Sequence, residues 1–251
     1  MLVHVQRFLS FLEDLVFPFS CLGCGRTGSI LCADCARAWS LEGQPQCHRC
    51  GTPTPMPQSQ CWRCQNWPPV LVTVRAPFRF DGPVRQAIHQ LKYRGVRGAA
   101  PQLGRYLAAY AATELSSIRG QTSWAVVPIP LHPTRQRERG FNQAALLAKP
   151  VADALGIPVI HGLVRQQATR PQVGQSYAAR QRNVAGAFAW RQGKQMPSAV
   201  ILVDDVVTTG ATMVAACEVL QAGGVQTVVG LALARHLLAG NMPHREDANR
   251  V

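Results

Sequence analysis

The sequence lacks any run of about eighteen apolar residues, the length that a helix needs to cross a membrane. The fairly apolar stretch 1–19 carries Glu13 and Asp14 in its middle, and it has neither the basic start nor the small-residue cleavage site of a signal peptide. We therefore expect a cytoplasmic protein without a membrane span. Residues 1–19 are expected to form an amphipathic helix that packs on the rest of the chain.

Lysine and acidic residues are scarce: the 26 basic residues are mostly arginine, and only 13 acids oppose them, so the formal net charge is +13. This excess lies in the middle of the chain. Residues 75–191 hold 17 basic and 4 acidic residues, which equals the whole net charge, while the two flanking segments nearly balance. Because guanidinium groups match phosphate oxygens, the charge indicates an anionic partner, either a nucleic acid or a small polyphosphate. A solvated arginine-rich surface is the alternative.

Eight of the nine cysteines form four Cys-x-x-Cys pairs in the first quarter of the chain. Two such pairs can surround one ion with four thiolates, so the four pairs predict two structural Zn²⁺ sites. The ligands are Cys21, Cys24, Cys32, Cys35, Cys47, Cys50, Cys61 and Cys64. Disulfides are a weaker explanation in a chain without a secretory signal.

The pairing of the four cysteine pairs has two solutions. Consecutive pairs can share an ion, or alternate pairs can combine. The loops between consecutive pairs are short and lose less entropy on closure, which favours the consecutive scheme. The module is expected to be structural or to dock a protein.

Beyond a proline-rich link at 67–69, short apolar stretches alternate with helical patterns. Strands are predicted at 71–80, 125–129, 199–203 and 225–234, and helices at 82–93, 99–118, 141–155 and 211–222. The stretch 71–80 fits one strand or an antiparallel pair, and Pro150 is expected to kink or split its helix. The alternation predicts an α/β fold, with a parallel sheet flanked by helices on both faces.

Residues 159–190 interrupt this alternation with a polar segment rich in arginine and glutamine. An insertion of this length usually serves as a lid or a binding element, although a solvated excursion fits the composition equally well. The last residues, 236–251, are polar and are expected to be disordered.

The chemistry is concentrated at 200–212, where an apolar strand ends in Asp204 and Asp205 and a Thr/Gly-rich turn leads into a helix. Backbone N–H groups and hydroxyls beside a helix N-terminus form a cradle for phosphate. Two adjacent acids before the cradle suit a ligand whose hydroxyls lie close to its phosphate, such as a ribose 5-phosphate. A capped helix after a surface turn is the alternative, but buried acids need partners.

This segment resembles the ribose-phosphate loop of type I phosphoribosyltransferases, which bind 5-phosphoribosyl diphosphate (PRPP). Together with the cysteine pairs, four further segments resemble the ComF family, a bacterial phosphoribosyltransferase-like group linked to competence and DNA utilisation: 80–93, 127–133, 139–143 and 181–184. The resemblance covers roughly residues 20–235. It implies a double zinc ribbon at 20–67 and a phosphoribosyltransferase-type domain at 70–235, with residues 159–190 in the variable hood.

The resemblance also implies roles for single residues. Asp204 and Asp205 bind the ribose hydroxyls and form the catalytic pair, and Mg²⁺ bridges ribose and diphosphate. The remaining PRPP-binding positions are Val206, Val207, Thr208, Thr209, Gly210, Ala211 and Thr212, and the diphosphate loop is Pro128, Ile129, Pro130 and Leu131. Candidates for neutralising diphosphate are Arg135, Arg139, Arg180 and Arg182; a solvated basic face competes for each.

Three functions remain open at this point. The chain is a phosphoribosyltransferase that releases diphosphate at the anomeric carbon, a non-catalytic PRPP sensor that contacts single-stranded DNA, or a zinc-organised adaptor that docks on a competence helicase. The phosphate cradle supports the first two equally, since binding and turnover need the same loop.

Overall fold

The computed structural model describes residues 19–56, 61–93, 98–121, 123–166 and 186–237. The helix predicted at 1–19 lies outside these residues but for its last position, as does most of the tail predicted at 236–251 and the centre of the insertion. Within the described part, none of the helices has both the length and the apolar character that crossing a bilayer requires.

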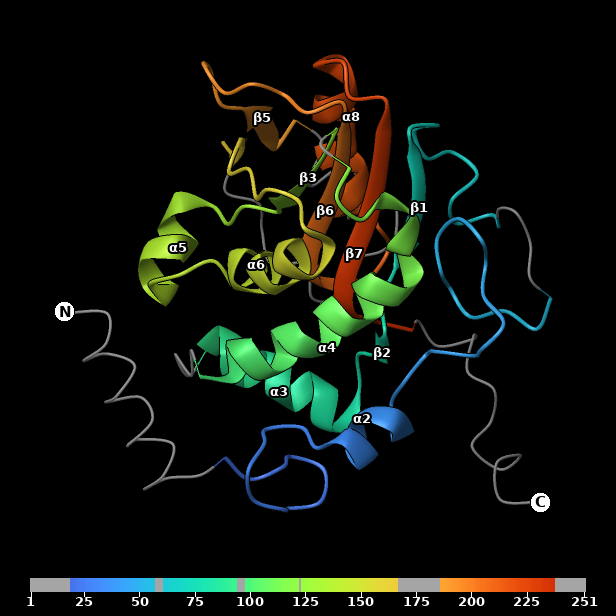
Figure 1. The fold of residues 1–251 in the computed structure, drawn as a ribbon, viewed down its shortest axis with the longest axis vertical. Helices are drawn as coiled ribbons and strands as arrows, with labels where there is room; N and C mark the ends of the chain where they lie inside the picture. Colours follow the sequence, from blue (N-terminus) through green and yellow to red (C-terminus); the bar gives the residue numbers. More distant parts are fainter. Residues whose placement is uncertain (1–18, 57–60, 94–97, 122, 167–185, 238–251) are drawn as a thin grey trace.

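A parallel sheet forms the centre of the molecule (Figure 1). Its strand order is β1 (Leu71–Arg75), β7 (Thr227–Arg235), β6 (Ala199–Val207) and β3 (Trp124–Pro128). Both β6 and β7 are almost wholly buried. These strands are apolar because they are covered on both faces, which confirms the predicted α/β architecture.

The stretch predicted at 71–80 forms two short strands that run in the same direction. After β1, the short β2 (Phe78–Arg79) continues along the same neighbour, and both segments pair with β7 in parallel. The alternative prediction, an antiparallel pair within 71–80, is therefore wrong. The chain between the two segments bends instead of reversing.

Strand β6 is longer than predicted. Its pairing with β3 ends at Pro128 opposite Val203, whereas its pairing with β7 continues to Val207 opposite Arg235. The prediction that the strand ends before the two acids is wrong: Asp204 and Asp205 lie inside β6. They occupy the part of the strand that extends past its β3 neighbour.

One face of the sheet is covered by α3 (Gly82–Tyr93), α4 (Ala99–Glu114) and α6 (Gln143–Leu155), whose apolar side chains share one core with β6 and β7. Figure 1 shows α4 and α6 in front of these strands, with α3 beneath α4. A short helical turn, η1 (Ser116–Ile118), leads from α4 to β3.

Helix α6 begins at Asn142, whose side chain accepts a hydrogen bond from Ala144 N at 3.1 Å, and it runs through Pro150 without the predicted split. Gly104 of α4 lies against the ring of that proline, where a Cβ would approach Pro150 Cγ to 2.8 Å. The helices α4 and α6 therefore pack closely at a glycine.

A helix that the sequence analysis missed, α5 (Pro133–Arg139), precedes α6. Its signals were Pro133 at the first helical position and Gly140 with φ +75° after the last one. His132 caps it by accepting a hydrogen bond from Thr134 N at 3.3 Å.

The other face carries α8 (Ala211–Ala222), the second half of the cysteine-rich segment, and an antiparallel pair formed by β4 (Leu163–Arg165) and β5 (Phe188–Trp190). The insertion therefore leaves and re-enters the domain as two paired strands. Its centre, 167–185, is outside the described residues.

The cysteine-rich segment contacts both faces. Its first half, with the short α2 (Ala33–Ala38), packs on α3 and α4, where Tyr106 donates to Leu31 O at 2.9 Å. The chain then passes β2, where Leu41 N donates to Pro77 O at 2.7 Å, and its second half packs beside β1. The segment is thus integrated into the domain at the β1 edge of the sheet.

Candidate functional site

The turn after β6 has the geometry of an anion cradle. Residues 208–210 connect β6 to the N-terminus of α8, and Gly210 has φ +82°, a conformation that favours glycine. The hydroxyl of Thr209 accepts a hydrogen bond from Ala211 N at 3.3 Å, so this side chain braces the turn. Thr208 and Thr212 are partly exposed. The positive end of a twelve-residue helix therefore lies beside two partly exposed threonines.

The two acids before this turn occupy different environments. Asp204 is partly exposed, and its Oδ1 accepts a hydrogen bond from Asp205 N at 2.8 Å. Asp205 is only 4% exposed. Its carboxylate pairs with Lys92 Nζ at 2.6 Å, and Gln143 Nε2 lies 3.4 Å from the same oxygen. The two neighbouring carboxyls also interact with each other, by charge and by a side-chain hydrogen bond, and α3 and α6 supply the other partners of the buried one.

The environments separate the pKa values of the two carboxyls. Desolvation, followed by the charge of Asp205, raises the pKa of Asp204 well above its usual range. Burial also opposes ionisation of Asp205, but the charge and hydrogen bond of Lys92 outweigh it, so the pKa of Asp205 is lowered. The two environments therefore shift the carboxyl pKa values in opposite directions.

The turn predicted as the diphosphate loop lies beside the acids. Pro128 ends β3, and Ile129 N donates to Val203 O at 2.8 Å, one residue before Asp204. Asn142 Nδ2 donates to Ile129 O at 3.0 Å, which fixes the turn to the start of α6. Pro130 and Leu131 follow and are partly exposed.

Arginines gather at the same edge. Arg135 and Arg139 are the partly buried positions of α5, one turn apart, whereas Arg137 is exposed. The positive charge of Arg139 contributes to the lowered pKa of Asp205. Arg165 of β4 is also close: burial and then Arg135 lower its pKa, while Asp204 raises it.

The structure thus brings together the two acids, the cradle, the turn at 128–131 and the predicted Arg135 and Arg139. Arg180 and Arg182 lie outside the described residues. The sequence analysis missed Lys92, Gln143 and Arg165 as members of the site. Lys92 and Gln143 stood in segments that carried the family resemblance, and this was the available signal. Arg165 had none, because its place depends on the pairing of β4 with β5.

The eight paired cysteines form two tetrads, Cys21, Cys24, Cys32, Cys35 and Cys47, Cys50, Cys61, Cys64, within each of which all sulfurs lie within 4.8 Å of one another. The consecutive scheme is therefore confirmed. Four thiolates about 2.3 Å from a tetrahedral Zn²⁺ have sulfurs about 3.8 Å apart. The distances of 3.7 Å for Cys24–Cys32, 3.7 Å for Cys47–Cys64 and 3.5 Å for Cys50–Cys61 fit that geometry.

The two tetrads differ in exposure. In the first, Cys24 is exposed and Cys35 is partly exposed, whereas in the second only Cys61 is partly exposed. Arg235, which is 3% exposed, donates from Nη2 to the carbonyl of Cys50, so a buried cation lies beside the second tetrad. Zn²⁺ held by four thiolates would form a complex of net negative charge. At the second tetrad, Arg235 would partly compensate that charge, and the buried cysteines would shield the ion from solvent.

We expect a chelator to remove zinc from the protein in two phases of about one ion each, because exposure of the ligands limits access. A metallochromic dye monitors the release. The double variant Cys24→Ser/Cys35→Ser should lose the fast phase and keep the slow one. Release of both ions at one rate, or loss of the slow phase in this variant, would contradict the difference between the sites.

The raised pKa of Asp204 predicts that this residue destabilises the fold at neutral pH. Above about pH 3.9 this carboxyl ionises in the unfolded chain but stays protonated in the folded chain. The loss of folding free energy therefore grows as the pH rises, until the pH reaches the pKa of Asp204 in the folded protein. Asp204→Asn should therefore raise the melting temperature, and more so at pH 7 than at pH 5. The exposed Asp34→Asn is the control. An equal or lower melting temperature at pH 7 would refute the electrostatic penalty.

Known proteins are similar to this chain in both its cysteine-rich part and its α/β part. The chain matches the models of a double zinc ribbon domain at residues 12–65 and a phosphoribosyl transferase domain at residues 142–251. It is 33% identical over 211 residues to the DNA utilization protein YhgH of Salmonella typhimurium, covering 82% of this chain and 91% of that protein.

Two competence proteins are similar over comparable lengths. Competence protein F of Haemophilus influenzae is 29% identical, with 87% of this chain and 98% of that protein covered. Competence protein ComFC of Streptococcus pneumoniae is 27% identical, with 82% and 88% covered. With both domain models in the expected order and relatives matched over most of their length, the chain belongs to the ComF family.

Proposed function

We propose that this chain binds PRPP with Mg²⁺ at the carboxyl edge of its sheet, transfers the phosphoribosyl group to an acceptor, and serves DNA utilisation in the cytoplasm. The observation that carries the proposal is the pair Asp204 and Asp205, placed where β6 extends past β3 and beside the N-terminus of α8. The relatives named for DNA utilization and competence support the biological context. Two cysteine tetrads with metal-ligand spacing fit a reducing compartment, where thiols are kept available for metal.

The cradle at 208–212 binds the 5-phosphate in this proposal. Backbone N–H groups at the start of α8 and the hydroxyls of Thr208 and Thr212 supply the donors. The carboxyls of Asp204 and Asp205, near the end of β6, then bind the ribose hydroxyls in this proposal. Of the two carboxyls, that of Asp204 is the more exposed, and Lys92 holds that of Asp205.

The diphosphate lies on the α5 side of the site. Arg135, Arg139 and Arg165 supply positive charge there. In the turn at 128–131, the two prolines have no N–H and the Ile129 N–H donates to Val203 O, so Leu131 N–H is the backbone donor left for the leaving group. Lys92 holds Asp205 in place from α3. The donor set of carboxyl and phosphate oxygens suits Mg²⁺, which supplies charge neutralisation to the departing diphosphate when bound.

The transfer is a substitution at the anomeric carbon. The bond from that carbon to the diphosphate oxygen breaks, and its electron pair leaves with diphosphate. The acceptor's lone pair forms the new bond, and the acceptor's proton passes to solvent. The carbon becomes positively charged during the exchange, so the ionised carboxylate of Asp205 stabilises it and the arginines stabilise the leaving group.

The double variant Asp204→Asn/Asp205→Asn should weaken PRPP binding by at least roughly a hundredfold, because two hydrogen bonds to charged or strongly polar groups are lost. Calorimetric titration with PRPP and Mg²⁺ measures it. The matched control is Asp34→Asn/Asp153→Asn, which removes two exposed acids elsewhere. Equal PRPP affinity in the two double variants would overturn the site assignment.

A second candidate function, contact with single-stranded DNA, is favoured by the charge of residues 75–191. Among the described residues, the exposed arginines outside the site are Arg85, Arg105, Arg119, Arg137 and Arg191. Exposed arginines bind nucleic-acid phosphates through counterion release, so affinity falls steeply with salt.

Binding of a labelled oligonucleotide should weaken by at least roughly tenfold between 50 and 200 mM salt. Arg137→Gln should lower this affinity and leave PRPP binding unchanged, because Arg137 lies on the exposed face of α5. Salt-independent binding, or none, would exclude the DNA contact without bearing on PRPP.

A further inference from the structure

The second zinc ribbon, defined here as residues 47–67, contacts the anion cradle directly. Trp67, three residues after the ligand Cys64, is 4% exposed and shares a core with Cys47, Cys50 and Ala211. A Cβ placed on Gly210 would lie 2.4 Å from Trp67 Cζ2 and 2.9 Å from its Cη2. The indole ring therefore lies against the backbone of the glycine that turns β6 into α8.

Arg49 ties this tryptophan to the metal site. It stands between the ligands Cys47 and Cys50, and its guanidinium donates to the carbonyls of Cys64 at 3.2 Å, Trp67 at 2.9 Å and Pro68 at 2.8 Å. Trp67 N also donates to Cys64 O at 3.1 Å. One side chain thus joins both cysteine turns of the second tetrad to the segment that carries Trp67.

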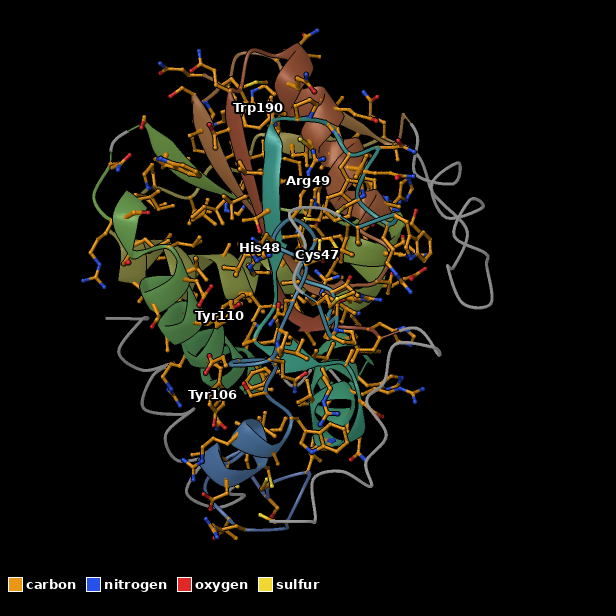
Figure 2. The ribbon with its side chains drawn as sticks, turned by 90° about the vertical axis from the view of Figure 1, so that its right-hand side faces the viewer. Cys47, His48, Arg49, Tyr106, Tyr110 and Trp190 are labelled. Carbon is orange, nitrogen blue, oxygen red and sulfur yellow. The ribbon has the colours of Figure 1, made fainter. Side chains whose placement is uncertain are left out.

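The ribbon is also hydrogen-bonded to the sheet at β1. The carbonyl of His48 accepts from Thr73 Oγ1 at 3.1 Å and from Arg75 Nη2 at 2.6 Å. Figure 2 shows Cys47, His48 and Arg49 beside β1. At Gly51 a Cβ would lie 2.5 Å from Val74 O, so the cysteine turn rests on the strand itself.

The first ribbon has no comparable contact among the described residues. Its Ile30 N donates to Gln102 Oε1 at 2.8 Å and its Leu31 O accepts from Tyr106, so it is anchored on α4. Figure 2 places Tyr106 below the second ribbon, on the helix that covers the other face of the sheet. The two ribbons therefore differ in what they can influence.

We propose that Trp67 is a positioning residue for the phosphate end of the site, and that the second zinc ribbon supports the cradle through it. This inference rests on the proposed function. The Nε1 atom of Trp67 is buried and has no hydrogen-bond partner among the described residues, so the support is packing against Gly210. Loss of the ring leaves a cavity behind the turn, and the N–H groups at the start of α8 lose their fixed direction.

The test compares two ligands that occupy different ends of the site. Trp67→Leu should weaken binding of ribose 5-phosphate by roughly tenfold and leave binding of magnesium diphosphate within about twofold, since only the phosphate cradle loses support. Trp67→Phe keeps an aromatic ring and should fall between Trp67→Leu and the parent protein. Calorimetry measures both affinities, and metal analysis checks that each variant keeps two zinc ions.

Trp62 provides the matched control. It belongs to the same ribbon but is 65% exposed, so Trp62→Leu should leave both affinities unchanged. Equal ribose 5-phosphate affinity in the folded Trp67 variants and the parent would overturn the inference, as would an equal loss for both ligands. Should Trp67→Leu fail to fold, Trp67→Phe decides by the same criterion. A failure of the proposed function gives a different result from a failure of this inference: in the former case Asp204→Asn/Asp205→Asn would leave PRPP binding intact.

Discussion

The unequal length of two neighbouring strands is the constraint on which the site depends. Because β6 continues past the end of β3, Asp204 and Asp205 lie in a strand segment whose described sheet partner is β7 alone. Such a position would be costly for a buried acid without a partner. Lys92 and Gln143 offset that cost for Asp205, and they come from two helices on one face of the sheet. The strand, its acids and these helices therefore form one electrostatic unit.

Several charged and polar groups surround that unit. The start of α8 offers backbone donors beside Thr208 and Thr212, and arginines approach the acids from α5 and from β4, which lies on the same face of the sheet as α8. The acids themselves differ, since the pKa of Asp204 is raised and that of Asp205 is lowered. The carboxyls thus stand between positively charged groups of three elements, α3, α5 and β4.

The zinc ribbons complete the domain instead of being appended to it. The first covers α3 and α4, and the second occupies a position beside β1 and α8 where it shares the core. Buried Arg235, at the end of β7, donates to a carbonyl of the second tetrad and links the carboxyl edge of the sheet to the metal site. A structural ion at that place stabilises a segment whose own apolar core is small.

The sequence by itself determined the elements whose signals are local. Cysteine spacing identified the two tetrads, apolar patterns predicted the strands and most helices, and the succession of acids, threonines and glycine located the turn between β6 and α8. Tertiary structure decided the extent of β6, the pairing of Asp205 with Lys92, the place of Arg165 and the contact of Trp67 with Gly210. Each of these features depends on strand register or on packing between segments far apart in the chain. Local residue spacing does not encode register or long-range packing.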